Sequence, residues 1–200
     1  MNTLKAEKRD MEVKAKKLRR EGYVTGNLFG RKIERSIPVK ILKKEVDQLL
    51  KTDNKGSQLM LDVDGQVYNA LIKEIDFNPL AGRVDEIDFQ ALVSDEKVRS
   101  VAEVALLNHD KMGDGVIQAD LNEIAYSALP AALIDRVEID LAEMKIGDVI
   151  KVKDLAIAKN KDIDLHTDLE AVVVAINEAH NNQEEADEET EETAQETPAE

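Results

Sequence analysis

The chain has 200 residues, of which 42% are hydrophobic, 34% are charged and 3% are aromatic, and its formal net charge is −15. This length allows one medium domain or two small ones, and the absence of Trp means that aliphatic side chains must build most of the core. The chain has no Cys, which excludes disulfides, thiol catalysis and cysteine metal sites, and no apolar run approaches the about 18 residues that a membrane-spanning helix needs.

The net charge is distributed unevenly along the chain. Residues 1–55 contain 16 Lys and Arg against 8 Asp and Glu, whereas residues 178–200 contain 10 acidic residues and no basic one. A basic first segment and an acidic last one indicate separate partners for the two ends. The amino-terminal sequence MNTLKAEKRD lacks the apolar segment of a signal peptide, so we expect a cytoplasmic protein.

The first predicted element is a short basic helix over residues 14–20, KAKKLRR. Its five cations, with no acid among them, are Lys14, Lys16, Lys17, Arg19 and Arg20. Ala15 and Leu18 are three residues apart, so on a helix they share a face and can dock on a domain while the cations fan outward. Glu21-Gly22 should end the helix, with Gly22 as its cap.

The next elements read mostly as strands. We expect strands over 23–29 and 36–41, a short helix over 43–51, and a further strand over 83–93. Between them, residues 57–77 contain Asp64-Gly65 flanked by two alternating runs, which is a strong hairpin signal. So many strands in fewer than 100 residues predict a small barrel or a curled sheet.

The chain begins a second β-rich stretch after residue 93. Predicted strands cover 98–108, 133–144, 147–157 and 169–177, and residues 116–129 read as strand or mixed structure. This half is acidic, with 17 Asp and Glu against 9 Lys and Arg over residues 94–177. We therefore divide the chain into domains 1–93 and 94–177 and a tail, 178–200. The tail has no Val, Leu, Ile or aromatic residue after Glu178, so we expect it to be disordered.

Catalytic and metal-binding patterns are absent from the sequence. The three histidines, His109, His166 and His180, are far apart and show no metal-ligand spacing. No phosphate-binding loop of the P-loop type and no Gly-x-Ser-x-Gly motif occurs. We therefore expect no enzyme, no metal, no cofactor, no membrane attachment and no small-molecule substrate.

The basic helix is then the main candidate for a functional site, and its positive charge has two possible interpretations. Lys supplies point charge and Arg a bidentate fork for phosphate, so the cations suit a nucleic-acid backbone. The alternative is a solvated helix face, whose charge the upstream acids Glu7, Asp10 and Glu12 partly offset.

Three segments carry a resemblance to a known family. KKLRREGYVTGNLFG (16–30) resembles the bacterial large-subunit ribosomal protein family that includes the general stress protein Ctc. IKEIDFNPLAGRVDEIDF (72–89) is similar to the family's run of apolar-Gln-x-x-Pro followed by His-x-Asp-Phe. ALPAALIDRVEIDLAEMKIGDVIKVKDLAI (128–157) looks like part of its second domain. The matches occur in order over residues 4–177.

The resemblance implies both a fold and a function. The fold is mainly β: an N-terminal six-stranded-type β-barrel with short helices, followed by a second β-rich domain. The function is that of a structural constituent of the large ribosomal subunit, binding 5S rRNA by shape, phosphates and sugar hydroxyls. Neighbouring ribosomal proteins are the expected partners of the second domain. The residues implied for RNA binding are Lys14, Lys16, Lys17, Arg19, Arg20, Phe29, Arg31, Asp76, Glu86 and Asp88, with Phe29 packing and Asp88 accepting a hydrogen bond.

Several positions depart from the family pattern. Phe29 replaces a Tyr, Thr25 replaces a Pro, Asp76 replaces an RNA-facing Gln and Glu86 replaces a His. A carboxylate facing a phosphate loses a hydrogen bond and adds repulsion of about 1 kcal/mol or more. The alternative function is therefore a divergent, stress-related paralogue with weak or no 5S rRNA binding, which acts as a protein-interaction module.

Overall fold

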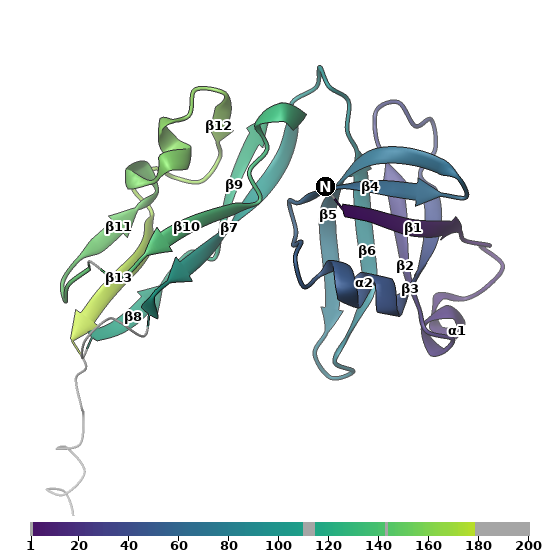
Figure 1. The fold of residues 1–200 in the computed structure, drawn as a ribbon, viewed down its shortest axis with the longest axis horizontal. Coiled ribbons are helices and arrows are strands. Elements are labelled where there is room, and N and C mark those ends of the chain that lie inside the picture. Colours follow the sequence, from purple (N-terminus) through teal and green to yellow (C-terminus); the bar gives the residue numbers. More distant parts are fainter. Residues whose placement is uncertain (1, 110–114, 143, 179–200) are drawn as a thin grey trace, which may run out of the picture.

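The computed structural model describes residues 2–109, 115–142 and 144–178, and it is mainly β, as predicted (Figure 1). The predicted tail, residues 178–200, lies outside the described residues apart from Glu178. Two short α-helices accompany the first six strands: α1 (Ala15–Arg20) and α2 (Lys43–Leu49).

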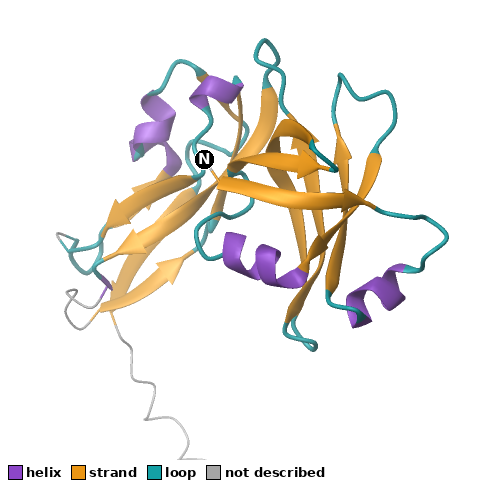
Figure 2. Cartoon of the chain, turned by 45° about the vertical axis from the view of Figure 1, so that its right-hand side comes forward, coloured by secondary structure: helices purple, strands orange, loops and turns teal. Residues whose placement is uncertain are grey.

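The first half forms a closed six-stranded barrel, which confirms the predicted fold (Figure 2). The strand order around the barrel is β1-β3-β2-β6-β5-β4. The strands are β1 (Asn2–Lys8), β2 (Tyr23–Phe29), β3 (Ile37–Leu42), β4 (Gln58–Val63), β5 (Gln66–Asn78) and β6 (Arg83–Ala91).

The hairpin between β4 and β5 turns at Asp64-Gly65, as predicted. Both residues have positive φ, +50° at Asp64 and +88° at Gly65, which is what a two-residue hairpin turn of the favoured hand requires. The Asp62 carboxylate accepts a hydrogen bond from the Gly65 amide over 2.8 Å. The turn sets the register of the long β4–β5 ladder, in which Val63 faces Gln66.

Alternating side chains fill the barrel. Val39 and Ile41 of β3 and Leu59 and Leu61 of β4 are fully buried, and they pack in one cluster with Phe89 of β6. Helix α2 closes the barrel by burying Val46 and Leu49 in the same cluster. The helix predicted from this spacing is therefore confirmed, although it is a little shorter than expected.

The sequence did not predict strand β1. Its residues include only Leu4 and Ala6 as buried side chains among polar neighbours. It forms because β4 offers it a parallel partner from Asn2 to Ala6, and that partner is more than fifty residues away in the chain. Non-local pairing of this kind leaves little local signal.

The second half is a separate β-rich unit with its own core. Its strands are β7 (Val98–Leu107), β8 (Gly115–Ala119), β9 (Glu123–Ala128), β10 (Arg136–Asp140), β11 (Val149–Lys151), β12 (Ile163–Leu165) and β13 (Val172–Glu178). They form two sheets, ordered β10-β7-β9-β12 and β11-β13-β8. A 3-10 turn also occurs at Pro130–Ala132.

The strand predicted over 147–157 is correct only over Val149–Lys151. Beyond it the chain forms two 3-10 turns, Val152–Asp154 and Ala156–Lys159. The Asp154 carboxylate accepts a hydrogen bond from the Lys151 amide over 3.1 Å, a local bond that competes with strand pairing. The buried residues Val152 and Leu155 are three apart, which suits a 3-10 turn.

Polar contacts join the two halves. Gln58 Nε2 donates to the Pro130 carbonyl oxygen over 2.6 Å, and Lys73 Nζ donates to the Arg99 carbonyl oxygen over 2.7 Å. At Gly56, where φ is +91°, an added Cβ would overlap a carbonyl oxygen of β7, so the two backbones come too close for a side chain.

Candidate nucleic-acid interface

Helix α1 lies on the outside of the barrel against β2. Leu18 is its one buried residue, while Lys14, Lys16, Lys17 and Arg20 are exposed. Gly22 follows the helix with a φ of +87°, a conformation that ends helices and that glycine adopts without strain. One apolar residue therefore packs the helix on the barrel, while Lys14, Lys16, Lys17 and Arg20 present positive charge to solvent.

Arg19 differs from its neighbours because it faces the barrel. Its Nε donates to the Asp85 carbonyl oxygen over 3.0 Å, and its side chain is only 23% exposed. The Asp85 carboxylate in turn accepts from Arg83 over 2.8 Å and from Asn78 over 3.2 Å. The Arg83 hydrogen bond is the main cause that lowers the pKa of Asp85. Arg19 thus fastens α1 to β6, whatever else it binds.

The outer face of β2, β6 and β5 continues the surface beside α1. Asp88 on β6 accepts hydrogen bonds from the Asn27 backbone amide over 2.9 Å and from Asn27 Nδ2 over 3.3 Å. Asn27 Nδ2 also reaches Glu86 Oε1 over 3.4 Å. Asn27 therefore links β2 to two acidic residues of β6, a role that the sequence did not predict. The one indication in the sequence was its position next to Leu28, since neighbouring residues of a strand point to opposite faces.

The same face gathers carboxylates. Asp76 lies opposite Glu86, and Glu74 lies opposite Asp88, in the antiparallel β5–β6 ladder. Partial burial raises the pKa of Glu86, and the neighbouring charge of Asp88 raises it further, while nearby guanidinium groups oppose the shift. Two of the four residues that depart from the family pattern, Asp76 and Glu86, are thus adjacent on this face.

The remaining residues of the sequence prediction lie elsewhere. Phe29 is half-buried at the end of β2 away from α1, where it pairs with Gln90. The Arg31 side chain is 77% exposed, and its guanidinium lies 3.8 Å from the Glu96 carboxylate after the barrel. The structure therefore brings Asp76, Glu86 and Asp88 together beside α1, and it places Phe29 and Arg31 at a separate edge.

Two classes of site receive no support within the described residues. No group of three or more His, Asp or Glu side chains there is arranged to hold a metal ion. No helix in the described ranges is long and apolar enough to cross a membrane.

Comparisons with known proteins give one family match in each half of the chain. Residues 4–89 match the model of the Ribosomal L25p family, and residues 97–180 match that of the C-terminal domain of ribosomal protein TL5. A large ribosomal subunit protein bL25 from Carboxydothermus hydrogenoformans is 30% identical over 165 residues, covering 80% of each chain. The bL25 protein of Exiguobacterium sibiricum is 30% identical over 182 residues, covering 88% of this chain and 79% of the relative. That of Thermoanaerobacter pseudethanolicus is 29% identical over 164 residues, covering 81% of each.

Proposed function

The chain belongs to the ribosomal L25p family, and from this premise we propose that it is a structural constituent of the large ribosomal subunit that binds 5S rRNA. The binding surface is α1 together with the outer face of β2, β6 and β5. The family is one of ribosomal proteins and not of enzymes, which confirms the prediction that the chain has no catalytic function. The ribosome places the protein in the cytoplasm.

The observation that carries the proposal is the way α1 is mounted on the barrel. Leu18 and Arg19 fix the helix, so Lys16 and Lys17 are held out at a defined position beside the sheet face. These lysines then contact phosphates, and Lys14 and Arg20 add positive charge at either end. A helix fixed in advance loses less side-chain and backbone freedom on binding than a flexible basic segment does.

The sheet face beside α1 supports recognition of an RNA duplex by shape. The wide, shallow minor groove of A-form RNA displays sugar hydroxyls, which are donors and acceptors. Asn27, Glu86 and Asp88 offer an amide and acceptor oxygens on this face. Phe29 and Arg31, at their separate edge, would make a second contact further along the RNA. The acidic second domain, residues 94–177, then faces neighbouring ribosomal proteins.

A second candidate function rests on Asp76 and Glu86. Two adjacent carboxylates at the RNA face would repel phosphates, and a divergent paralogue with weak or no 5S rRNA binding would act through protein contacts instead. The retained Lys16, Lys17 and Arg19 favour the ribosomal function, because phosphate contacts supply much of the affinity of proteins for nucleic acids.

The deciding experiment is 5S rRNA binding by the purified protein over a salt series. Lys16→Glu with Lys17→Glu is the test variant, because it reverses two exposed charges and leaves Arg19 and its contact to β6 intact. Lys159→Glu with Lys161→Glu makes the same charge change on the second domain. We expect tight binding that weakens with salt and is lost in the test variant alone. A folded wild-type protein that binds 5S rRNA no better than an unrelated duplex would overturn the proposal.

A further inference from the structure

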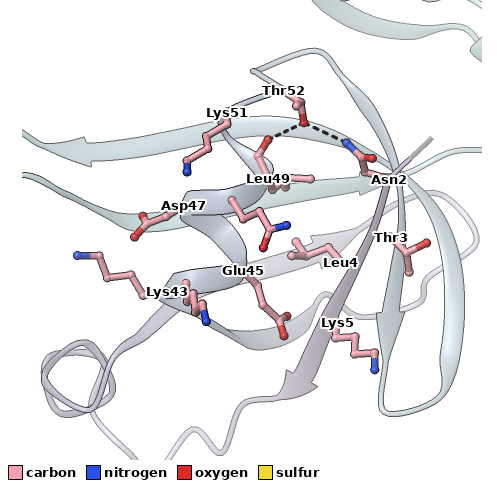
Figure 3. A pocket seen from close by; sticks show the side chains of 12 residues that line it. Asn2, Thr3, Leu4, Lys5, Lys43, Glu45, Asp47, Leu49, Lys51 and Thr52 are labelled. Atoms are coloured by element: carbon pink, nitrogen blue, oxygen red, sulfur yellow. Dashed lines mark hydrogen bonds between the residues drawn. The ribbon is translucent and has the colours of Figure 1, made fainter.

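A groove of about 950 Å³ lies between β1 and α2, on a part of the barrel that the proposed interface does not use (Figure 3). Four lysines and two carboxylates line it: Lys5, Lys43, Lys44, Lys51, Glu45 and Asp47. Lys5 comes from β1, while the other lysines come from α2 and the turn that follows it, so positive charge borders the groove on both sides.

The strand pairing of the barrel explains why the groove exists. β1 pairs with β4 along Asn2–Ala6, but it pairs with β3 only at Glu7 and Lys8. The remaining edge of β1 therefore faces α2 instead of a strand. Asn2 Nδ2 donates to Thr52 Oγ1 over 3.1 Å and so ties β1 to the segment after α2 (Figure 3).

The lysines of the groove form no ion pair with any residue that the structure describes. Among the described residues, Lys40, Lys55, Lys97, Lys151 and Lys153 each lie within 3 Å of a carboxylate oxygen. The four groove lysines form no such pair with any residue in the described ranges, although Glu45 and Asp47 are on the same helix. Their ammonium groups keep all three donors available for an external anion.

The position of the groove separates it from the carboxylate face. In the closed order β1-β3-β2-β6-β5-β4, β1 stands three strands from β6 in either direction. Glu86 and Asp88 thus project on the side of the barrel opposite the groove. An RNA phosphate backbone approaching β1 and α2 meets four lysines without meeting the acids of β5 and β6.

We infer that the groove between β1 and α2 is a second RNA-binding surface, which holds a phosphate backbone through Lys5, Lys43, Lys44 and Lys51. RNA fits better than a protein partner because lysine is depleted at the centre of protein interfaces, whereas compact ammonium groups are common phosphate contacts. The apolar residues of the groove, Leu4 and Leu49, are buried in its floor and offer no apolar docking patch. This surface does not depend on 5S rRNA being the RNA that the α1 face selects.

The test compares two variants of the full-length protein with equal changes in charge. The groove variant is Lys43→Gln, Lys44→Gln and Lys51→Gln. The control variant is Lys145→Gln, Lys159→Gln and Lys161→Gln on the second domain. These three lysines likewise form no ion pair with any described residue. Affinities for 5S rRNA and for an unrelated RNA duplex of about 16 base pairs, the span of a typical duplex-binding domain, are measured over a salt series.

Each lost phosphate contact should lower the magnitude of the slope of log affinity against log salt by about 1. For the groove variant, which lacks three lysines, this magnitude should therefore fall by about 2 to 3 with both RNAs. The control should keep the wild-type slope. Amine modification of the wild-type protein, read residue by residue, should show Lys43, Lys44 and Lys51 protected by either RNA. Equal slopes for the two variants, or no protection of these lysines in the RNA complex, would overturn the inference. If the wild-type protein binds 5S rRNA no better than the unrelated duplex, but the slope still falls in the groove variant, only the proposed function is refuted.

Discussion

Neutralising the carboxylates of the proposed RNA-binding face should strengthen binding to 5S rRNA. The variant is Asp76→Asn with Glu86→Gln, which keeps the size of both side chains and leaves an acceptor for Asn27. Two like charges 4 Å apart cost about 1 kcal/mol in water, so removing two carboxylate–phosphate pairs should gain about 2 kcal/mol, or about thirtyfold in affinity. Because the pKa of Glu86 is raised by burial, its charged form already destabilises the fold, and neutralising it should not lower the thermal midpoint.

The assay is fluorescence anisotropy with labelled 5S rRNA at low and high salt. The control variant, Glu138→Gln with Asp162→Asn, removes two exposed charges from the second domain. We expect the gain at about 0.1 M salt and its disappearance near 1 M, where the screening length falls to about 3 Å. An affinity that rises no more in the test variant than in the control would show that Asp76 and Glu86 do not face phosphates, and the reasoning from the sheet face would fail.

Three further predictions concern the fold, the second domain and the acidic tail. Gly56→Ala should lower the thermal midpoint of unfolding far more than Gly22→Ala does. Both positions have positive φ, but only at Gly56 would the new Cβ strike a backbone oxygen. Equal shifts of the midpoint in calorimetry would contradict this. Hydrogen bonds from Lys153 and, to a lesser extent, from Lys151 lower the pKa of Glu170 to about 2. This pKa should rise in the Lys153→Gln variant. Since the folded-state pKa lies below the ordinary 4.5, this carboxylate stabilises the fold above pH 4.5, and the contribution fades as the pH falls toward 2; an unshifted NMR titration would exclude the contact. Deleting residues 178–200 removes 10 acidic residues that can compete with RNA for the basic residues, so RNA binding should strengthen at low salt only. An unchanged affinity at low salt would exclude this competition.

The sequence predicted those parts of the fold whose signals are local. Asp64-Gly65 specified a hairpin by backbone conformation alone, and Val46 with Leu49 specified a helix by spacing. Strand β1 was missed because its partner β4 is distant in the chain and its own residues are mostly polar. The 3-10 turns after Lys151 were missed because an alternating pattern does not reveal that Asp154 turns back on the backbone.

The candidate interface was predictable in outline but not in its contacts. Ala15 and Leu18 indicated how the basic helix docks, and Leu18 is indeed the buried residue. That Arg19 would bond to Asp85, 66 residues away, depends on the closure of the barrel, which no local pattern encodes. The lysine groove was hidden for the same reason, since one of its walls is the strand that the sequence did not reveal.

The charges of the molecule restrict how it can lie on RNA. The groove at β1 and the carboxylate face at β5 and β6 are on opposite sides of the barrel, and α1 lies beside β2 between them. The second domain carries 17 acids against 9 bases over residues 94–177, so it repels a phosphate backbone. RNA that contacts both α1 and the groove must therefore curve around the barrel through β3 and away from the second domain. A straight duplex reaches one surface at a time, whereas a folded RNA, or two RNA segments, can occupy both.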